Sequence, residues 1–165
     1  MSETDGIDVG DCDDIPLART LFREYLEATI EEIGLPNPEE SPTVLAGMRA
    51  DIDALPWPYV PPNGALLVAR VGDAAAGSVG LARLDATTTE LRRLWVRPSF
   101  RRAGVARTLT VASFERAAAL GSERIVLDVV PSRTGAIDLY RSLGFTEIEP
   151  YDEYPFPMVF LGRAV

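Results

Sequence analysis

The segment from residue 87 to 130 constrains the fold more than any other part of the sequence. "TTTELRRLWVR" (87–97) is rich in β-branched and aromatic residues and predicts a strand that Pro98 ends. An arginine-rich turn, "RRAGVA" (101–106), then opens a helix that we expect to end at Gly121. "RIVLDVV" (124–130) is a nearly continuous apolar run, typical of a strand covered on both faces in a parallel pairing. Together these elements predict a β-α-β crossover.

The segments on either side of this crossover predict a single domain. Before it come a weak strand, an amphipathic helix, a weaker helix and two hairpin strands, at residues 6–10, 15–33, 43–55, 65–71 and 77–85. After it come a helix and one or two strands, at residues 135–143 and 145–165. The order β-α-α-β-β-β-α-β-α-β-β predicts an α/β fold (α+β in some schemes), with a mixed central sheet of six to seven strands and about four helices. A length of 165 residues suits one domain over residues 1–165.

Residue types that the chain lacks exclude several classes of enzyme. It has no histidine, which excludes a Ser-His-Asp triad and the usual zinc sites. All 16 basic residues are arginine, so no lysine is present to form a Schiff base or to serve a P-loop. Cys12, the only cysteine, has no histidine to activate it, and we expect a small, partly buried thiol. We therefore predict no metal site, and chemistry that rests on Glu, Asp, Tyr, Ser, Thr, Arg and the backbone.

Charge is distributed unevenly along the chain. Residues 1–82 hold 15 acidic residues and 4 arginines, whereas residues 83–165 hold 10 acidic residues and 12 arginines. Seven of these arginines lie between residues 83 and 107. A local positive field in a chain of net charge −9 favours one small anionic ligand and disfavours nucleic acid, which the remaining surface would repel. The alternative is a set of solvated surface arginines.

The sequence contains neither a membrane-spanning pattern nor a secretion signal. Its longest uncharged apolar stretch, "GALLVA" (64–69), is too short to cross a bilayer. The first 14 residues are acidic and have no basic segment followed by an apolar one. We expect no membrane partner and a cytoplasmic location.

The turn at residues 101–106 has the properties of an anion site. It leads into the first turn of a helix, where backbone N–H groups are free and the helix dipole is positive. Gly104 lets the backbone approach a ligand closely, Ala106 keeps the next face small, and Arg101 and Arg102 can add charged hydrogen bonds. Phosphate is the natural ligand of such a turn. A G-x-G-x-x-G pattern is missing, so this is not a dinucleotide fingerprint.

The stretch "ELRRLWVRPSFRRAGVARTL" closely resembles the acetyl-CoA-binding core of the GCN5-related N-acetyltransferase (GNAT) family. The signature of that family is Arg/Gln-x-x-Gly-x-Gly/Ala between a strand and a helix, and Arg101, Gly104 and Ala106 match it. "AIDLYRSLGF" (136–145) resembles the second signature, a helix with a tyrosine four residues before Gly-Phe. The resemblance covers about residues 77–147 and implies a single-domain acyl-CoA N-acyltransferase fold.

The resemblance also implies where acetyl-CoA binds. The strand that ends near Val96 would splay from the strand at 124–130, and the pantetheine arm would pair with the backbone of Leu94, Trp95 and Val96. The pyrophosphate would contact backbone N–H groups of Arg102, Ala103, Gly104, Val105 and Ala106. Arg101 is either a direct ligand or a residue that stabilises the turn, and the Trp95 side chain is expected to pack. Ser132 is a further candidate ligand, although Arg133 stands where many relatives have asparagine.

Two residues are implied to act in catalysis. Acetyl transfer to an amine needs a base, an oxyanion donor and an acid for the departing thiolate, but no covalent enzyme intermediate. Tyr140 matches the position that often places a phenol near the sulfur, as a general acid. Glu90 resembles the acid that in many relatives deprotonates the amine, often through water, and Asp128 is a second candidate for the base. A backbone N–H of residues 94–96 would bind the oxyanion.

The acceptor is much less visible in the sequence. The resemblance implies a site walled by the first two helices, the proline-rich loop with Trp57 and Tyr59, and the segment "EPYDEYPFP" with residues 151–154. An acidic, aromatic wall suits a cationic amine. An acidic solubilising surface is the alternative. The expected function is N-acetyl transfer from acetyl-CoA to a primary amine of a small molecule, by a monomer or homodimer. The alternatives are a protein or peptide N-acetyltransferase and a non-catalytic acyl-CoA-binding module.

Overall fold

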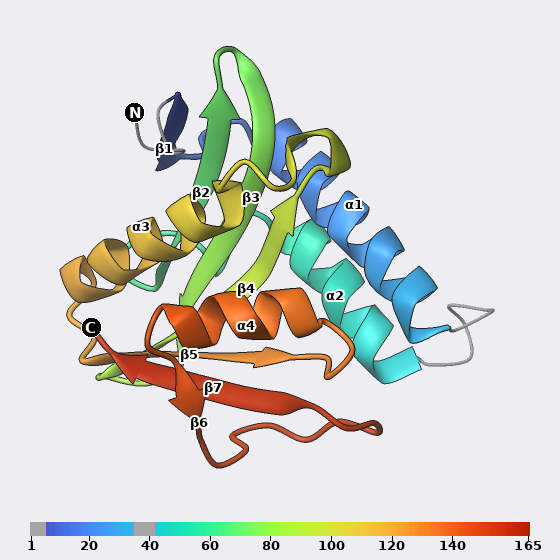
Figure 1. Cartoon of the computed structure of the whole chain (residues 1–165), viewed down its shortest axis with the longest axis vertical. Coiled ribbons are helices and arrows are strands. Elements are labelled where there is room, and N and C mark those ends of the chain that lie inside the picture. The colour runs from blue at the N-terminus through green and yellow to red at the C-terminus, as the bar shows by residue number, and fades with distance from the viewer. Residues whose placement is uncertain (1–5, 35–41) are drawn as a thin grey trace.

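The computed structural model of the chain describes residues 6–34 and 42–165, and in these parts the predicted element order is confirmed. Figure 1 shows the arrangement. The helices and strands are β1 (Ile7–Asp11), α1 (Ile15–Ile33), α2 (Pro42–Ala54), β2 (Gly64–Val71), β3 (Ala74–Arg83), β4 (Thr88–Val96), α3 (Val105–Ala119), β5 (Arg124–Val129), α4 (Thr134–Ser142), β6 (Thr146–Glu147) and β7 (Val159–Ala164). A short 3-10 helix, Pro98–Phe100, precedes the arginine-rich turn.

The strands form one mixed sheet in the order β1-β2-β3-β4-β5-β7-β6. β4 and β5 pair in parallel across the α3 crossover, and the other neighbouring strands pair antiparallel. The hairpin between β2 and β3 is tighter than predicted, because Ala74 already pairs with Val71. A fold with one parallel pair between two antiparallel halves agrees with the predicted mixed sheet.

Helices cover both faces of the sheet and make two cores. α1 and α2 pack on one face with residues such as Leu21, Phe22 and Leu45, whereas α3 and α4 pack on the other face with Leu109 and Ile137. Both ends of α1 are capped, since the Asp14 side chain accepts a hydrogen bond from the Leu17 N–H at 3.0 Å and Gly34 ends the helix in a left-handed conformation. No helix in the described ranges is long and apolar enough to cross a membrane.

The strands β4 and β5 diverge in the middle of the sheet, as the family resemblance implies. Their pairing runs only from Thr88 opposite Arg124 to Glu90 opposite Val126. Beyond Glu90, β4 has no pairing with β5, and Figure 1 shows the two strands fanning apart. Beyond this point the facing edges of β4 and β5 have no strand partner, although β4 still pairs with β3 and β5 with β7. The sheet is therefore open at its centre.

Candidate functional site

Two cavities meet where β4 and β5 diverge. One, which we call the turn cavity, has a volume of about 590 Å³ and lies beside the arginine-rich turn, α4 and α1. The other, which we call the charged cavity, has a volume of about 360 Å³ and lies between α2, β4, β5 and the segment at 152–154. Tyr25, Leu91, Arg93 and Asp128 line both cavities. A molecule in one cavity can therefore touch a molecule in the other.

The turn cavity brings together part of the predicted acetyl-CoA site. The predicted residues that line it are Leu94, Trp95, Val96, Arg101, Ala106 and Tyr140. The other predicted ligands, Arg102, Ala103, Gly104, Val105 and Ser132, are not among its lining residues, so their roles stay predictions. β4 contributes Leu91, Leu94 and Val96 beside Arg93 and Trp95, and beyond Glu90 its edge toward β5 has no strand partner.

The turn presents the start of α3 without a side-chain cap. Gly104 is the N-cap residue, its φ of 86° is left-handed, and no side chain of the described residues caps the helix. Glycine adopts such a φ without a steric penalty. Because the first N–H groups of a helix have no partner within it, they can bind an anion that approaches the turn.

Arg101 and Trp95 hold the turn against the rest of the fold. Arg101 Nε donates to the Val96 carbonyl at 3.3 Å, and its guanidinium carbon lies 5.2 Å from the centre of the Trp95 ring. Trp95 Nε1 in turn donates to Glu24 Oε1 at 3.1 Å, on α1. These contacts agree with a turn-stabilising Arg101 and a packing Trp95, the two roles that the sequence left open beside direct binding.

Arg133 connects the start of α4 to α1 along the wall of the turn cavity. Its guanidinium donates to Glu32 Oε2 at 2.6 Å, to the Tyr25 hydroxyl at 3.0 Å and to Thr29 Oγ1 at 2.8 Å. The Ser132 hydroxyl donates to the other Glu32 oxygen at 3.0 Å. The arginine that replaces the asparagine of many relatives thus joins two helices.

Tyr140 lies in the core with its hydroxyl near the turn cavity. The ring packs edge-on against Phe145 at 5.5 Å between centroids, and 5% of the residue is exposed. Burial raises the pKa of the phenol above its ordinary value, and neighbouring Tyr25 adds to this. The hydroxyl makes no hydrogen bond to another described residue. It is therefore protonated at neutral pH and free to bind a ligand.

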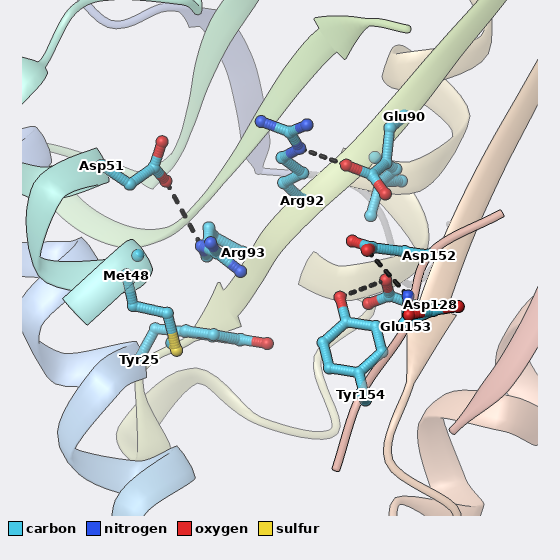
Figure 2. A pocket seen from close by; sticks show the side chains of 12 residues that line it. Tyr25, Met48, Asp51, Glu90, Arg92, Arg93, Asp128, Asp152, Glu153 and Tyr154 are labelled. Carbon is cyan, nitrogen blue, oxygen red and sulfur yellow. Dashed lines mark hydrogen bonds and ion pairs between the residues drawn. The ribbon is translucent and has the colours of Figure 1, made fainter. Parts of the chain in front are cut away.

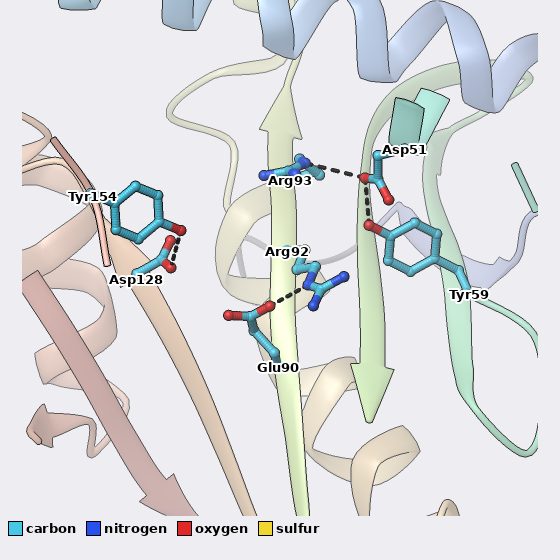
Figure 3. A network of polar contacts seen from close by, with 7 residues as sticks. All are labelled: Asp51, Tyr59, Glu90, Arg92, Arg93, Asp128 and Tyr154. Atoms are coloured by element: carbon cyan, nitrogen blue, oxygen red, sulfur yellow. Dashed lines mark hydrogen bonds and ion pairs between the residues drawn. The ribbon is translucent and has the colours of Figure 1, made fainter. Parts of the chain in front are cut away.

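The charged cavity has Arg92 and Arg93 on one side and the carboxylates of Asp128, Asp152 and Glu153 on the other (Figure 2). On the β4 side, Arg92 Nε forms an ion pair with Glu90, and Arg93 Nε donates to Asp51 Oδ2 at 3.3 Å. The same Asp51 oxygen accepts a hydrogen bond from the Tyr59 hydroxyl at 2.6 Å (Figure 3). This network fixes Asp51 and Glu90 as partners of the two arginines.

Asp128 stands on the opposite side with a neutral partner. Its Oδ2 accepts a hydrogen bond from the Tyr154 hydroxyl at 2.6 Å (Figure 3). Burial raises the pKa of Asp128 to about 6, the negative charge of Glu90 adds to the rise, and the Tyr154 hydrogen bond opposes it. A carboxyl with this pKa is ionised at neutral pH but binds a proton readily, which suits a general base.

Of the segments predicted to wall the acceptor site, the C-terminal one contributes to the charged cavity and the proline-rich loop does not. Asp152, Glu153 and Tyr154 line the charged cavity. Trp57 is 54% exposed, and Tyr59 is buried in the core of α1 and α2, so neither lines it. The Tyr59 ring packs edge-on against Phe22 of α1, and its hydroxyl donates to Asp51 of α2.

The sequence analysis did not name four polar residues that line the charged cavity: Tyr25, Asp51, Arg92 and Arg93. Adjacent arginines within a strand break the usual alternation of apolar and polar residues, and that break was the available signal. Asp51 and Tyr25 come from helices far away in the sequence. Among residues 6–34 and 42–165 there is no cluster of His, Cys, Asp or Glu that could hold a metal ion.

Comparison with known proteins gives relatives of one kind. An uncharacterised N-acetyltransferase of Schizosaccharomyces pombe is 35% identical over 107 residues, which cover 64% of this chain and 66% of that protein. N-acetylaspartate synthetase of Danio rerio is 34% identical over 110 residues, which cover 66% of this chain and 38% of that protein. The matches therefore span less than two thirds of either relative.

Solved structures share the fold. An acetyltransferase from Streptococcus agalactiae superposes with a TM-score of 0.76 at 20% identity, over 98% of this chain and 99% of that one. A GNAT family acetyltransferase from Elizabethkingia anophelis, solved with acetyl-CoA bound, gives a TM-score of 0.62 at 18% identity, over 98% and 99%. The sequence model of the Acetyltransferase (GNAT) family matches residues 21–145. The protein thus belongs to the GNAT acetyltransferase family.

Proposed function

We propose that the protein transfers an acetyl group from acetyl-CoA to the primary amine of a small molecule, by direct attack in a ternary complex. The observation that carries the proposal is the meeting of two cavities at the divergence of β4 and β5, next to an uncapped helix N-terminus. One cavity suits a long thioester whose phosphates bind at the turn. The other suits the amine that attacks it.

The turn cavity fits the donor in chemistry as well as in place. The pyrophosphate binds the free N–H groups that follow Gly104, and Arg101 and Arg102 add positive charge nearby. The pantetheine amides form hydrogen bonds with the edge of β4 at Leu94 to Val96 that faces away from β3, and Ser132 is a further proposed contact. This arrangement brings the thioester to the junction of the cavities.

The reaction needs a base that accepts a proton from the amine and an acid that donates a proton to the departing thiolate. The amine nitrogen attacks the thioester carbonyl carbon, a base removes the proton from the nitrogen, and a backbone N–H of residues 94–96 stabilises the oxyanion. Collapse of the tetrahedral intermediate forms the amide and breaks the C–S bond. Tyr140, whose hydroxyl is protonated and lies beside the turn cavity, then gives its proton to the departing thiolate.

Asp128 is supported as the base more strongly than Glu90. Asp128 lines both cavities, its hydrogen-bond partner is neutral, and its pKa is about 6. Glu90 is buried, and its carboxylate is already engaged in an ion pair with Arg92. Glu90 instead raises the pKa of Asp128 and holds Arg92.

A small acceptor is favoured by the size of the charged cavity, about 360 Å³, and by its mixed charges. The name of the Danio rerio relative, N-acetylaspartate synthetase, also specifies a small amine as its acceptor. A protein or peptide acceptor would need an open groove for several residues. A non-catalytic acyl-CoA-binding module would have no use for a buried carboxyl of raised pKa beside a free phenol.

Thiol release from acetyl-CoA tests the proposal directly. Purified protein is incubated with acetyl-CoA and a panel of amino acids, polyamines, aminoglycosides and peptides, and free thiol is measured with time. We expect release with small amines. Stabilisation of the melting transition by acetyl-CoA without release by any acceptor would support the binding module, and acetylation of peptides alone would support the protein acceptor.

A further inference from the structure

The chain places two adjacent arginines on the same cavity wall. Neighbouring residues of a regular strand point to opposite faces of a sheet, yet Arg92 and Arg93 both line the charged cavity. A bulge in β4 explains this, because Gly80 pairs with Arg92 and Ser78 with Trp95, which leaves Arg93 and Leu94 opposite the single residue Val79. Arg93 has a φ of 57°, in the left-handed region that a long side chain adopts rarely.

The guanidinium of Arg93 retains unused donors. It carries five N–H donors, and among the described residues its one hydrogen bond runs from Nε to Asp51. Only about a quarter of the side chain, 25%, is exposed. A mostly buried guanidinium with free donors is costly unless an anion occupies the space beside it. The terminal nitrogens of Arg93 are thus suited to bind a carboxylate in a bidentate manner.

The opposite wall has the complementary charge. Asp128, Asp152 and Glu153 lie across the charged cavity from Arg92 and Arg93 (Figure 2). None of these three carboxyls forms an ion pair with a described arginine. The cavity therefore attracts a cation on one side and an anion on the other, as a zwitterion requires.

The position of Arg93 and Asp128 limits the distance between the two charges of the acceptor. Both residues line both cavities, so both face the junction where the thioester carbon must meet the amine. An amine beside Asp128 and a carboxylate on Arg93 would therefore both lie close to the reacting carbon. A polyamine would place no anion on Arg93, and neither a lysine side chain nor a protein N-terminus carries a carboxylate next to its amine.

We infer that the acceptor is an amino acid whose carboxylate is close to its reactive amine. Arg93 binds the carboxylate, Arg92 adds positive charge beside it, and Asp128 faces the amine. This inference rests on the proposed function, since the charged cavity is taken as the acceptor site. It goes further by naming a class of acceptor and the side chain that selects it.

Matched acceptors test the carboxylate requirement. L-alanine, L-leucine, L-phenylalanine, L-aspartate and L-glutamate are each compared with the corresponding carboxamide and the decarboxylated amine, and spermidine is included. For at least one series we expect kcat/KM to be about tenfold to a hundredfold higher with the free carboxylate, the value of a charged hydrogen bond. Equal or better turnover of carboxamides or of spermidine would overturn the inference and leave acetyl transfer intact.

Substitution of Arg93 separates selection from catalysis. Arg93→Gln should raise KM for the preferred amino acid about tenfold to a hundredfold and leave that for its carboxamide unchanged, so that the preference disappears. Arg93→Lys keeps the positive charge and should retain part of the preference for the carboxylate. Arg70→Gln, on β2 and away from both cavities, is the matched control. A preference that survives Arg93→Gln in a protein with an unchanged melting transition would overturn the role of Arg93.

Binding without turnover distinguishes failure of the inference from failure of the proposed function. Calorimetry of the protein saturated with CoA measures binding of the same amino acids and carboxamides. Carboxylate-selective binding without thiol release with any acceptor would refute acetyl transfer and support the ligand class. Absence of selective binding together with turnover of simple amines would refute the ligand class alone.

Discussion

The turn cavity and the charged cavity are built in different ways. One side of the turn cavity is a continuous segment, residues 94–106, which contains the end of β4 and the uncapped start of α3, and the other sides are residues of α1, β5 and α4. The charged cavity uses side chains from α1, α2, β4, β5 and residues 152–154. A backbone site depends on local conformation, whereas a side-chain site depends on which charges the fold brings together.

This difference separates two properties of the enzyme. A backbone site recognises groups common to every acyl-CoA, namely phosphates and amides, and tolerates changes of most side chains. A site of charged side chains changes its ligand when one charge changes. We therefore propose that the turn recognises the donor and that the charged side chains around β4 and β5 select the acceptor. The following substitutions test that division.

The largest effect is expected at Gly104. Gly104→Trp forces a side chain into a left-handed conformation and covers the N–H groups of the first turn of α3. Each lost hydrogen bond to a charged phosphate is worth about 1.5–3 kcal/mol, so kcat/KM for acetyl-CoA should fall more than about a hundredfold. Calorimetric titration with acetyl-CoA should show the same loss.

Gly121 provides the control for Gly104. It lies just beyond the other end of α3, its φ of 89° is also left-handed, and an added Cβ would meet no atom within 4 Å. Gly121→Trp should thus cost similar backbone strain, about 1–2 kcal/mol, and keep acetyl-CoA affinity. Equal loss of affinity in the two variants would mean that strain in α3, and not the turn, explains the effect.

The contrast between the cavities also explains what the sequence could predict. Strand, turn and helix around Gly104 are local features, and hydrophobic periodicity with the Gly and Pro signals was enough to order the elements of the described chain. The divergence of β4 and β5 followed from the family resemblance and is present in the strand register. Local sequence patterns thus predicted the fold and the turn at Gly104 where we propose that the donor binds.

The charged cavity could not be derived in the same way. Asp51 reaches Arg93 across 42 positions of sequence and Tyr154 reaches Asp128 across 26, and no local pattern encodes such pairs. The bulge that turns Arg93 into the cavity depends on pairing with β3, which places Val79 opposite two residues of β4. Composition predicted acidic residues near the acceptor, but it did not place Arg92 and Arg93 across the same cavity from them.

The second largest effect is expected at Asp128. Asp128→Asn removes the proposed base and should lower kcat about a hundredfold, the lower end of general-base contributions, with acetyl-CoA affinity unchanged. In the wild type, kcat/KM should fall as pH decreases through about 6, because the Asp128 carboxyl is then protonated. Glu90→Gln is the comparison: if it removes the acidic limb of the profile and Asp128→Asn keeps it, the base is Glu90.

Asp128→Asn should lower activity but increase the stability of the folded protein. The pKa of Asp128 is raised to about 6 in the folded protein, so folding favours its neutral form, and stability from this group is lost as pH rises through about 6. Asp128→Asn should therefore increase the free energy of unfolding by about 1–2 kcal/mol at pH 8 and have little effect below about pH 4. Urea denaturation at the two pH values measures this, and a loss of stability at pH 8 would contradict it.

An intermediate effect is expected at Tyr140, which belongs to the turn cavity but acts by its side chain. Tyr140→Phe keeps the ring against Phe145 and removes the proton donor for the thiolate. We expect kcat to fall about tenfold with KM for acetyl-CoA unchanged, since only the departing sulfur loses an interaction. Steady-state kinetics at saturating acceptor measures both constants. An unchanged kcat would assign Tyr140 to packing alone.

The smallest effect is expected at Trp95, and it tests whether the turn cavity depends on backbone. Trp95→Phe removes the indole N–H that donates to Glu24 and retains an aromatic ring under Arg101. The free energy of unfolding should fall by about 1 kcal/mol, the value of a hydrogen bond to a charged group that stays paired with Arg97. KM for acetyl-CoA should change less than about twofold, because the strand backbone at residue 95 is unaltered. A larger rise in KM without further loss of stability would show that the donor, like the acceptor, is selected by a side chain.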